Sequence, residues 1–144
     1  MILLGCVKLK QPAPAPAREL YVSPLWRKRR DYAEASRVPW LILSAKYGVL
    51  DPDERVAPYD LALSQLPLAE RRAWGHSVAN DLRRRLEDLR GVVFEVHAGR
   101  AYCVAIEKHL TAAGAIVDAP LAGLTQGRQL SWYTTPAGTA VSRP

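Results

Sequence analysis

Small, cationic and amide side chains follow the apolar runs that the sequence predicts to be strands. They are, in chain order, Cys6, Lys8, Lys10, Ser44, Lys46, Tyr47, Gly99, Tyr102 and Gln129. In an open sheet of parallel strands, ligands bind beyond the carboxyl ends of the strands. Cations, hydroxyls and amides at these ends suit an anionic ligand or the hydrogen-bonding edge of a nucleobase. We therefore expect these residues to line a common crevice.

Three residues are candidates for catalysis: Cys6, Lys46 and Asp60. Two lysines closely follow Cys6, and a nearby cation raises the thiolate fraction of a cysteine, so Cys6 could act as a nucleophile. The alternative is a small buried side chain at a strand end, because free cysteine is often buried. Lys46 directly follows an apolar run and needs an anion or a loop carboxylate as its partner. Asp60 is either a general acid or base facing the crevice or a helix N-cap.

Other residues are expected to bind the substrate. Lys8, Lys10, Lys46 and Arg18 would hold phosphate, with a solvated surface position as the alternative for the lysines. A base extruded from a nucleic acid would stack on an aromatic ring, as base-processing enzymes require. The rings considered for this stacking are those of Tyr21, Tyr47 and Tyr59.

A basic cluster formed by Arg27, Lys28, Arg29 and Arg30 has aromatic residues beside it, Trp26 and Tyr32. Cations together with aromatic rings are what a surface needs to bind a nucleic-acid backbone and its bases. The cluster therefore predicts a nucleic-acid-binding helix face. An ordinary solvated helix face is the alternative interpretation of such a run of charges.

The composition describes one folded domain with a basic bias. The chain has 144 residues, a net charge of +6 and 49% hydrophobic residues. We place the domain at residues 1–133 and a flexible tail at 134–144. No apolar run is long enough for a transmembrane helix, and the N-terminus lacks the basic segment of a signal peptide, so we expect a cytoplasmic protein without a membrane partner. The whole charge excess falls in residues 1–50, which favours a polyanionic partner there.

Strand and helix patterns alternate along the chain. Strands are predicted at Met1–Gly5, Trp40–Ser44, Gly91–Val96 and Ala115–Asp118. Helices are predicted from Arg18 or Pro24 to about Ser36, from about Pro67 to Leu89, from Arg100 to Ala113, and at about Arg128–Tyr133. Between them, Gln11–Ala17 is predicted to be a polyproline-like connector and residues 45–60 a loop. This alternation predicts a three-layer α/β/α sandwich around a mostly parallel sheet of four to five strands.

The sequence gives no sign of a metal site or a cofactor. Two cysteines, Cys6 and Cys103, and three scattered histidines do not form a zinc-binding pattern. P-loop, dinucleotide-binding and HExxH signatures are absent, and so is a Ser–His–Asp spacing. We therefore expect neither a metal nor a cofactor.

Several segments together resemble a family of small bacterial and phage proteins that carry an uncharacterised domain. They are Gly5–Lys10, Pro14–Tyr21, Ser23, Leu41–Leu50, Pro58–Asp60 and Pro120–Leu124. That family is distantly similar to the YaaA-like peroxide-stress proteins through Leu43–Asp53 followed by Pro58 and Tyr59. The spacing of Cys6 and Lys10 is similar to a Cys/Lys motif in the domain that archaeosine synthases use to modify a deazaguanine base in transfer RNA.

These resemblances imply an α/β domain concerned with nucleic acid or its bases, and YaaA-like proteins are regarded as DNA-binding. The present chain is much shorter than those proteins and has no evident helix-hairpin-helix. It also lacks the Tyr and His that follow the Cys/Lys motif in the synthases. Duplex binding through a helix-hairpin-helix and lysine-transfer chemistry are therefore not carried over.

The leading hypothesis is an enzyme that acts on a nucleobase or nucleotide within DNA or RNA. The reaction would be N-glycosidic cleavage or base exchange, as in a DNA glycosylase or a base-modifying transferase. The alternative is a non-catalytic DNA- or RNA-binding protein of the YaaA-like stress-response type, which needs only the basic cluster and the aromatic rings. A third hypothesis is an enzyme for a free nucleotide with no polymer partner.

Overall fold

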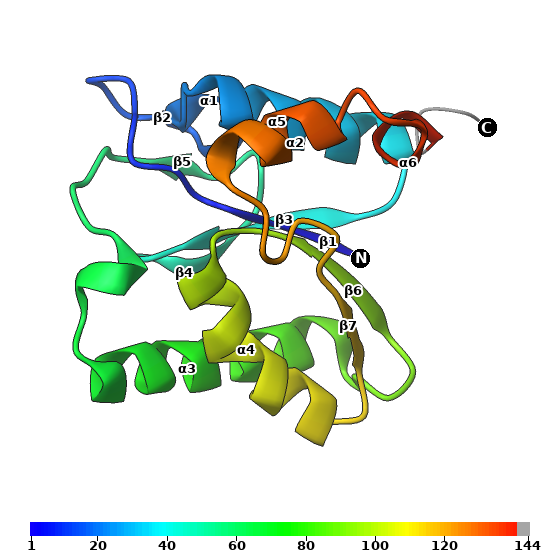
Figure 1. Cartoon of the computed structure of the whole chain (residues 1–144). Helices are drawn as coiled ribbons and strands as arrows, with labels where there is room; N and C mark the ends of the chain where they lie inside the picture. The colour runs from blue at the N-terminus through cyan, green and yellow to red at the C-terminus, as the bar shows by residue number, and fades with distance from the viewer. Residues whose placement is uncertain (141–144) are drawn as a thin grey trace.

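The computed structural model describes residues 1–140, which form a five-stranded sheet covered by helices (Figure 1). The strands lie in the order β4-β3-β1-β6-β7, with β1 (Ile2–Gly5) in the centre. Its neighbours β3 (Trp40–Ser44) and β6 (Val93–His97) run parallel to it, and β7 (Ile116–Asp118) runs parallel to β6. The edge strand β4 (Gly48–Leu50) is antiparallel to β3. The predicted α/β class with a mostly parallel sheet is confirmed.

Helices cover both faces of the sheet and complete a three-layer sandwich (Figure 1). One layer contains α1 (Ala17–Leu20), α2 (Pro24–Ser36), α5 (Gln126–Trp132) and α6 (Pro136–Ala140). The opposite layer contains α3 (Leu68–Leu86) and α4 (Arg100–Ala112), which pack on each other. Because α2 connects β1 to β3 and α3 connects β3 to β6, the strand order changes direction at β1. Within residues 1–140, no helix is long and apolar enough to cross a membrane.

Three short strands lie in segments that the sequence predicts to be a connector or a loop. β2 (Ala15–Pro16) pairs with β5 (Arg55–Val56) in a separate two-stranded sheet, and β4 forms a hairpin with β3. The connector and loop predictions are wrong at these residues, because such short strands are stabilised by their pairing partners rather than by a pattern of their own. Helix α6 falls in the segment predicted to be a tail, whereas residues 141–144 lie outside the described residues.

Helices α3 and α4 cross at Gly75 with almost no space between their backbones. A Cβ atom added to Gly75 would lie 2.0 Å from the carbonyl oxygen of Ala105 on α4. Only a residue without a side chain permits this approach. Gly75 therefore fixes the point at which the two helices of this layer touch.

His97 at the end of β6 is completely buried and joins the sheet to the chain after α5. The Glu95 carboxylate accepts a hydrogen bond of 2.7 Å from His97 Nε2, and the Tyr133 hydroxyl lies 2.7 Å from His97 Nδ1. Burial alone would raise the pKa of Glu95, but hydrogen bonds from His97 and Tyr32 outweigh burial and hold this pKa below its ordinary value. The ionised form of Glu95 therefore stabilises the folded chain.

We expect Glu95→Gln to lower the free energy of unfolding by about 1–3 kcal/mol at pH 7, the usual loss for a part-buried hydrogen bond to a charged group. Because the pKa of Glu95 is depressed in the folded chain, its stabilisation is complete above the ordinary glutamate pKa and is lost as the pH falls through the lower, folded value. Urea unfolding at neutral and acidic pH measures this change. Glu107→Gln, an exposed change on α4, is the matched control. An equal loss at both pH values for Glu95→Gln would contradict the assignment.

Candidate functional site

The candidate site lies beyond the carboxyl ends of β1, β3 and β6, where the strand order changes direction. β1 ends at Gly5 and the chain continues into the segment 6–12, which faces the segment 58–62 after β5. A crevice at such a switch point is the usual ligand site of an open α/β sheet. The fold therefore brings together two loops that are about fifty residues apart in the chain.

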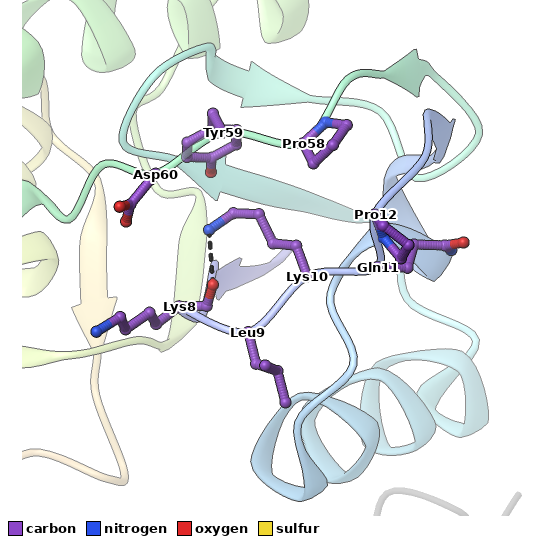
Figure 2. Close-up of a pocket in the computed structure, with 8 residues that line it drawn as sticks. All are labelled: Lys8, Leu9, Lys10, Gln11, Pro12, Pro58, Tyr59 and Asp60. Carbon is purple, nitrogen blue, oxygen red and sulfur yellow. Dashed lines mark hydrogen bonds between the residues drawn. The ribbon is translucent and has the colours of Figure 1, made fainter.

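Two adjoining cavities open between these segments and share Lys8, Lys10 and Asp60. In Figure 2 the two lysines lie on one wall, and Pro58, Tyr59 and Asp60 lie on the facing wall. The outer cavity has a volume of about 530 Å³ and is completed by Leu9, Gln11, Pro12, Pro58 and Tyr59. The inner cavity has a volume of about 120 Å³ and is completed by Cys6, Val7, Leu61, Ala62, Gln65 and Tyr102. The outer space accommodates a ligand of nucleotide size, and the inner one only a small group.

The shared rim of the two cavities carries charges of both signs. Lys10 Nζ donates to the carbonyl oxygens of Val7 at 3.1 Å and Lys8 at 3.0 Å, and it lies 4.3 Å from the centroid of the Tyr59 ring. Burial lowers the pKa of Lys10, while the nearby Cys6 and Asp60 oppose this shift. Asp60 does not cap a helix, because the following 3-10 turn η1 (Leu63–Gln65) begins after Ala62. Its carboxylate is therefore available at the rim.

Hydroxyl groups form a hydrogen-bonded cluster behind the outer cavity. Ser44 Oγ donates to the Tyr59 hydroxyl at 2.7 Å, and the hydroxyls of Tyr59 and Tyr21 lie 2.7 Å apart. Ser44 also accepts a hydrogen bond from the backbone N–H of Tyr47 at 3.0 Å. Burial raises the pKa of Tyr21 and Tyr59 far above the ordinary value, so both remain neutral at physiological pH. The cluster therefore positions Tyr59 and does not supply a base.

Cys6 and Tyr102 meet at the floor of the inner cavity. Cys6 Sγ lies 3.0 Å from the Tyr102 hydroxyl, and both residues are mostly buried, with 8% of each exposed. Burial and the neighbouring Cys6 both raise the pKa of Tyr102, so the hydroxyl can donate a hydrogen bond to sulfur. Cys6 belongs to the buried core and also lines the inner cavity. Lys8, Lys10 and Asp60 line the same cavity as Cys6.

Four of the predicted site residues lie away from these two cavities or are otherwise engaged. Lys46 is exposed on the β3–β4 turn, where its Nζ lies 5.4 Å from the centroid of the Tyr47 ring and not beside a carboxylate. Arg18 pairs with Asp53 at 2.9 Å, so its charge is already balanced. Tyr21 is 1% exposed and cannot stack on an extruded base, which corrects that prediction. Tyr47 remains partly exposed beside Tyr59.

The basic cluster on α2 does not form one surface. Arg27 and Lys28 are exposed, whereas Arg29 is 3% exposed and Arg30 pairs with Glu34 at 3.4 Å. The flanking aromatic residues Trp26 and Tyr32 are buried in the core and cannot contact a nucleic acid. The prediction of a continuous basic and aromatic helix face is therefore wrong, because the helical period turns every third or fourth residue inward.

Gly99 and Gln129 lie near the carboxyl ends of β6 and β7, outside the two cavities of the candidate site. Gly99 precedes the first turn of α4. Gln129 lines a separate, mostly apolar cavity of about 670 Å³, and its Oε1 accepts a hydrogen bond of 3.3 Å from Arg29. The crevice predicted from the strand ends is thus divided. Cys6, Asp60 and most of the polar residues line the outer and inner cavities beside β1, whereas Gln129 lines the separate cavity.

Sequence reasoning missed several residues around the site. Gln11 and Pro12 line the outer cavity, and Gln65 lines the inner one. Trp74 on α3 donates from its indole nitrogen to the carbonyl oxygen of Ser44 at 2.9 Å and so anchors the end of β3. A proline-rich connector placed directly after a strand end was the only available signal for the first two. Nothing in the local sequence marks Trp74, because its partner is distant in the chain.

Residues 1–135 match a model described as a family of unknown function, DUF6884. Neither the curated proteins nor the solved structures gave a match. Among the described residues, no group of three or more His, Cys, Asp or Glu side chains is arranged to hold a metal ion. The matched span includes both cavities and all of the segments on which the sequence resemblance rests. The chain therefore belongs to the DUF6884 family of unknown function.

Proposed function

We propose that the protein is an enzyme that acts on a nucleobase or nucleotide by cleaving or exchanging the N-glycosidic bond. The observation that carries this proposal is the rim of Lys8, Lys10 and Asp60 shared by a large outer and a small inner cavity. The two cations can bind a phosphate group of the substrate. The carboxylate opposite them can stabilise the positive charge that develops on the sugar as the N-glycosidic bond breaks. The resemblance to the YaaA-like proteins and to the archaeosine-synthase motif supports the same substrate class.

In this proposal the groups around the two cavities have different tasks. Lys8 and Lys10 bind the phosphate, and Tyr59, which lines the outer cavity, borders the base, with the partly exposed Tyr47 packed edge-on against the Tyr59 ring. Asp60 faces the sugar and stabilises the positive charge that develops at its C1′ carbon. Lys46, Arg18 and Tyr21 have no task here, because they do not line the cavities.

The hydrolytic step follows from these positions. Asp60 takes a proton from a water molecule, and the water oxygen forms a bond to C1′. The bond from C1′ to the base nitrogen breaks and its electron pair stays with the base. The base nitrogen takes a proton from solvent, and Asp60 releases its own proton to solvent. In base exchange, the Cys6 thiol would instead give its proton to Asp60 and attack C1′, and the leaving base would take that proton. A second base would then displace Cys6 and return a proton to it.

A non-catalytic nucleic-acid-binding protein is the second candidate. It is favoured by the exposed cations Lys8, Arg27 and Lys28, none of which forms an ion pair within residues 1–140. This candidate requires affinity that falls steeply with added salt and no reaction product. It does not require the carboxylate of Asp60.

The deciding experiment incubates the full chain with DNA and RNA oligonucleotides and with free nucleotides and measures released base by chromatography. We expect release by the wild-type protein and a rate about 10²–10⁴-fold lower for Asp60→Asn, the usual contribution of a general base. Glu54→Gln, which removes an exposed carboxylate just upstream in the chain, should leave the rate unchanged. Binding without release of any base would favour the second candidate. Equal rates for Asp60→Asn and the wild type would remove Asp60 from the mechanism.

A further inference from the structure

We infer that the groove between α3 and α4 binds an acidic, amphipathic peptide segment of a protein partner. The groove has a volume of about 500 Å³ and lies in the α3–α4 layer of Figure 1. It is lined by Leu68, Arg71, Arg72, Ala101, Val104, Ala105, Lys108 and His109. None of these residues lines the outer or inner cavity, so the inference is independent of the proposed function.

The charges of the groove are unbalanced. Arg71, Arg72 and Lys108 line it, no carboxylate does, and none of the three forms an ion pair within the described part of the chain. Farther along α3 the arrangement is the opposite, because Arg84 and Arg85 both pair with Asp81. The positive charge of the groove is therefore free to meet an acidic partner.

Arg71 also carries a polar atom without a partner. Its Nε atom is buried and makes no hydrogen bond within residues 1–140. The Nε atoms of Arg18 and Arg29 are in the same state, and an atom with no exposed surface is out of reach of an outside acceptor. The unpaired charge of Arg71, and not its Nε atom, therefore supports an acidic occupant.

The floor and rim of the groove are apolar, which decides between two kinds of anionic partner. Leu68 is 50% exposed and Val104 is 61% exposed, and Ala101 and Ala105 lie between the helices. Among the lining residues only His109 has a ring, and this ring packs against His76 at 5.4 Å, so the groove offers nucleic-acid bases little on which to stack. Apolar side chains flanked by carboxylates fit this surface better, as in the binding of an amphipathic helix to a groove.

The test titrates the isotope-labelled full chain with a synthetic peptide of about twelve residues, built from glutamate with leucine at helical spacing i, i+3, i+4 and i+7. We expect NMR shift changes confined to the groove and saturable binding by fluorescence anisotropy. Arg72→Gln combined with Lys108→Gln, both exposed positions, should weaken binding about tenfold or more. Arg55→Gln combined with Arg83→Gln removes the same charge from exposed positions elsewhere and should change the affinity less than twofold.

Two further probes separate the possible occupants. A peptide with serine in place of leucine should bind about tenfold more weakly if the apolar floor contributes. A thymidine oligonucleotide of about twenty nucleotides should not displace the leucine peptide. Displacement by the oligonucleotide, with the same sensitivity to the Arg72 and Lys108 changes, would assign the groove to nucleic acid and overturn the inference. Absence of saturable peptide binding, or equal binding by both double variants, would also overturn it.

Discussion

Replacing Arg29 by alanine is expected to lower the free energy of unfolding by about 2–4 kcal/mol, because the change combines a lost hydrogen bond with a cavity. Arg29 is 3% exposed, and its guanidinium donates to the carbonyl oxygen of Gly5 at 2.9 Å and to Gln129 Oε1 at 3.3 Å. Without Arg29, the carbonyl oxygen of Gly5 at the end of β1 and the side-chain oxygen of Gln129 on α5 each lose a hydrogen-bond donor. Urea unfolding of the full chain measures the effect.

The effect should extend to the candidate site. Gly5 is the last residue of β1, and Cys6 follows it directly into the inner cavity. Arg29 thus holds the strand end from which the site begins, and its loss should increase the rate at which a thiol reagent modifies Cys6. Cys103→Ser in the background removes the other thiol and makes Cys6 the only one measured. Faster modification of Cys6 together with a lower free energy of unfolding would show that Arg29 acts as a positioning residue for the end of β1.

Two variants separate charge from volume. Arg29→Met refills much of the space and relieves the cost of burying a guanidinium, whose pKa is lowered by that burial. It should therefore be less destabilising than Arg29→Ala. Arg27→Ala, on the exposed face of α2, should change the free energy of unfolding by less than about 0.5 kcal/mol. Equal urea midpoints for Arg29→Ala and Arg27→Ala would mean that the buried guanidinium makes no net contribution.

Arg29 also illustrates why the sequence misled at α2. A run of four cations predicts a solvated or anion-binding face, but burial in a helix follows the period of 3.6 residues. Trp26 and Ala33, three residues before and four residues after Arg29, are both completely buried. The position of Arg29 on this inward stripe was therefore a signal present in the sequence. It predicts burial for Arg29 and exposure for Arg27 and Lys28.

The central strands could be predicted, whereas the site could be predicted only in part. β1 and β3 are unbroken apolar runs, and a strand buried on both faces needs no information beyond its own residues. Cys6 and Asp60 were both chosen from residue type, and the fold places them on one cavity. The position of Lys46 on an exposed turn depends on the β3–β4 hairpin, which local patterns did not reveal.

Charge along the chain is a poor guide to charge in space. The basic excess of residues 1–50 is partly balanced in the fold, since Arg18 pairs with Asp53 from outside this segment. The cations of the groove between α3 and α4 come from residues 51–144, whose net charge is close to zero. They remain unpaired because acids of this part of the chain pair with other arginines. Arg85, for example, pairs with Asp51 and Asp81. Only the fold separates paired charges from unpaired ones.

The crossing of α3 and α4 gives the second large expected effect. Gly75→Ala should destabilise the fold by about 1–3 kcal/mol, and Gly75→Val by more. Alanine is the better helix former by about 1 kcal/mol, so local propensity alone predicts the opposite sign. The steric cost should exceed that gain, because the new Cβ would lie 2.0 Å from a backbone oxygen and 2.7 Å from the carbonyl carbon of Ala105. Backbone atoms cannot rotate away, so the helices must separate.

Gly127→Ala is the matched control, because Gly127 lies in α5 and a Cβ added there meets no atom within 4 Å. This variant should gain about 0.5–1 kcal/mol from helix propensity, whereas Gly75→Ala should lose stability in the same urea experiment. Equal gains at both positions would mean that α3 and α4 separate at little cost. The groove lined by Arg71 and Lys108 would then be a deformable surface, and an occupant could not be inferred from its present shape. Opposite signs would establish that the Gly75 contact holds the two walls of the groove at a fixed spacing.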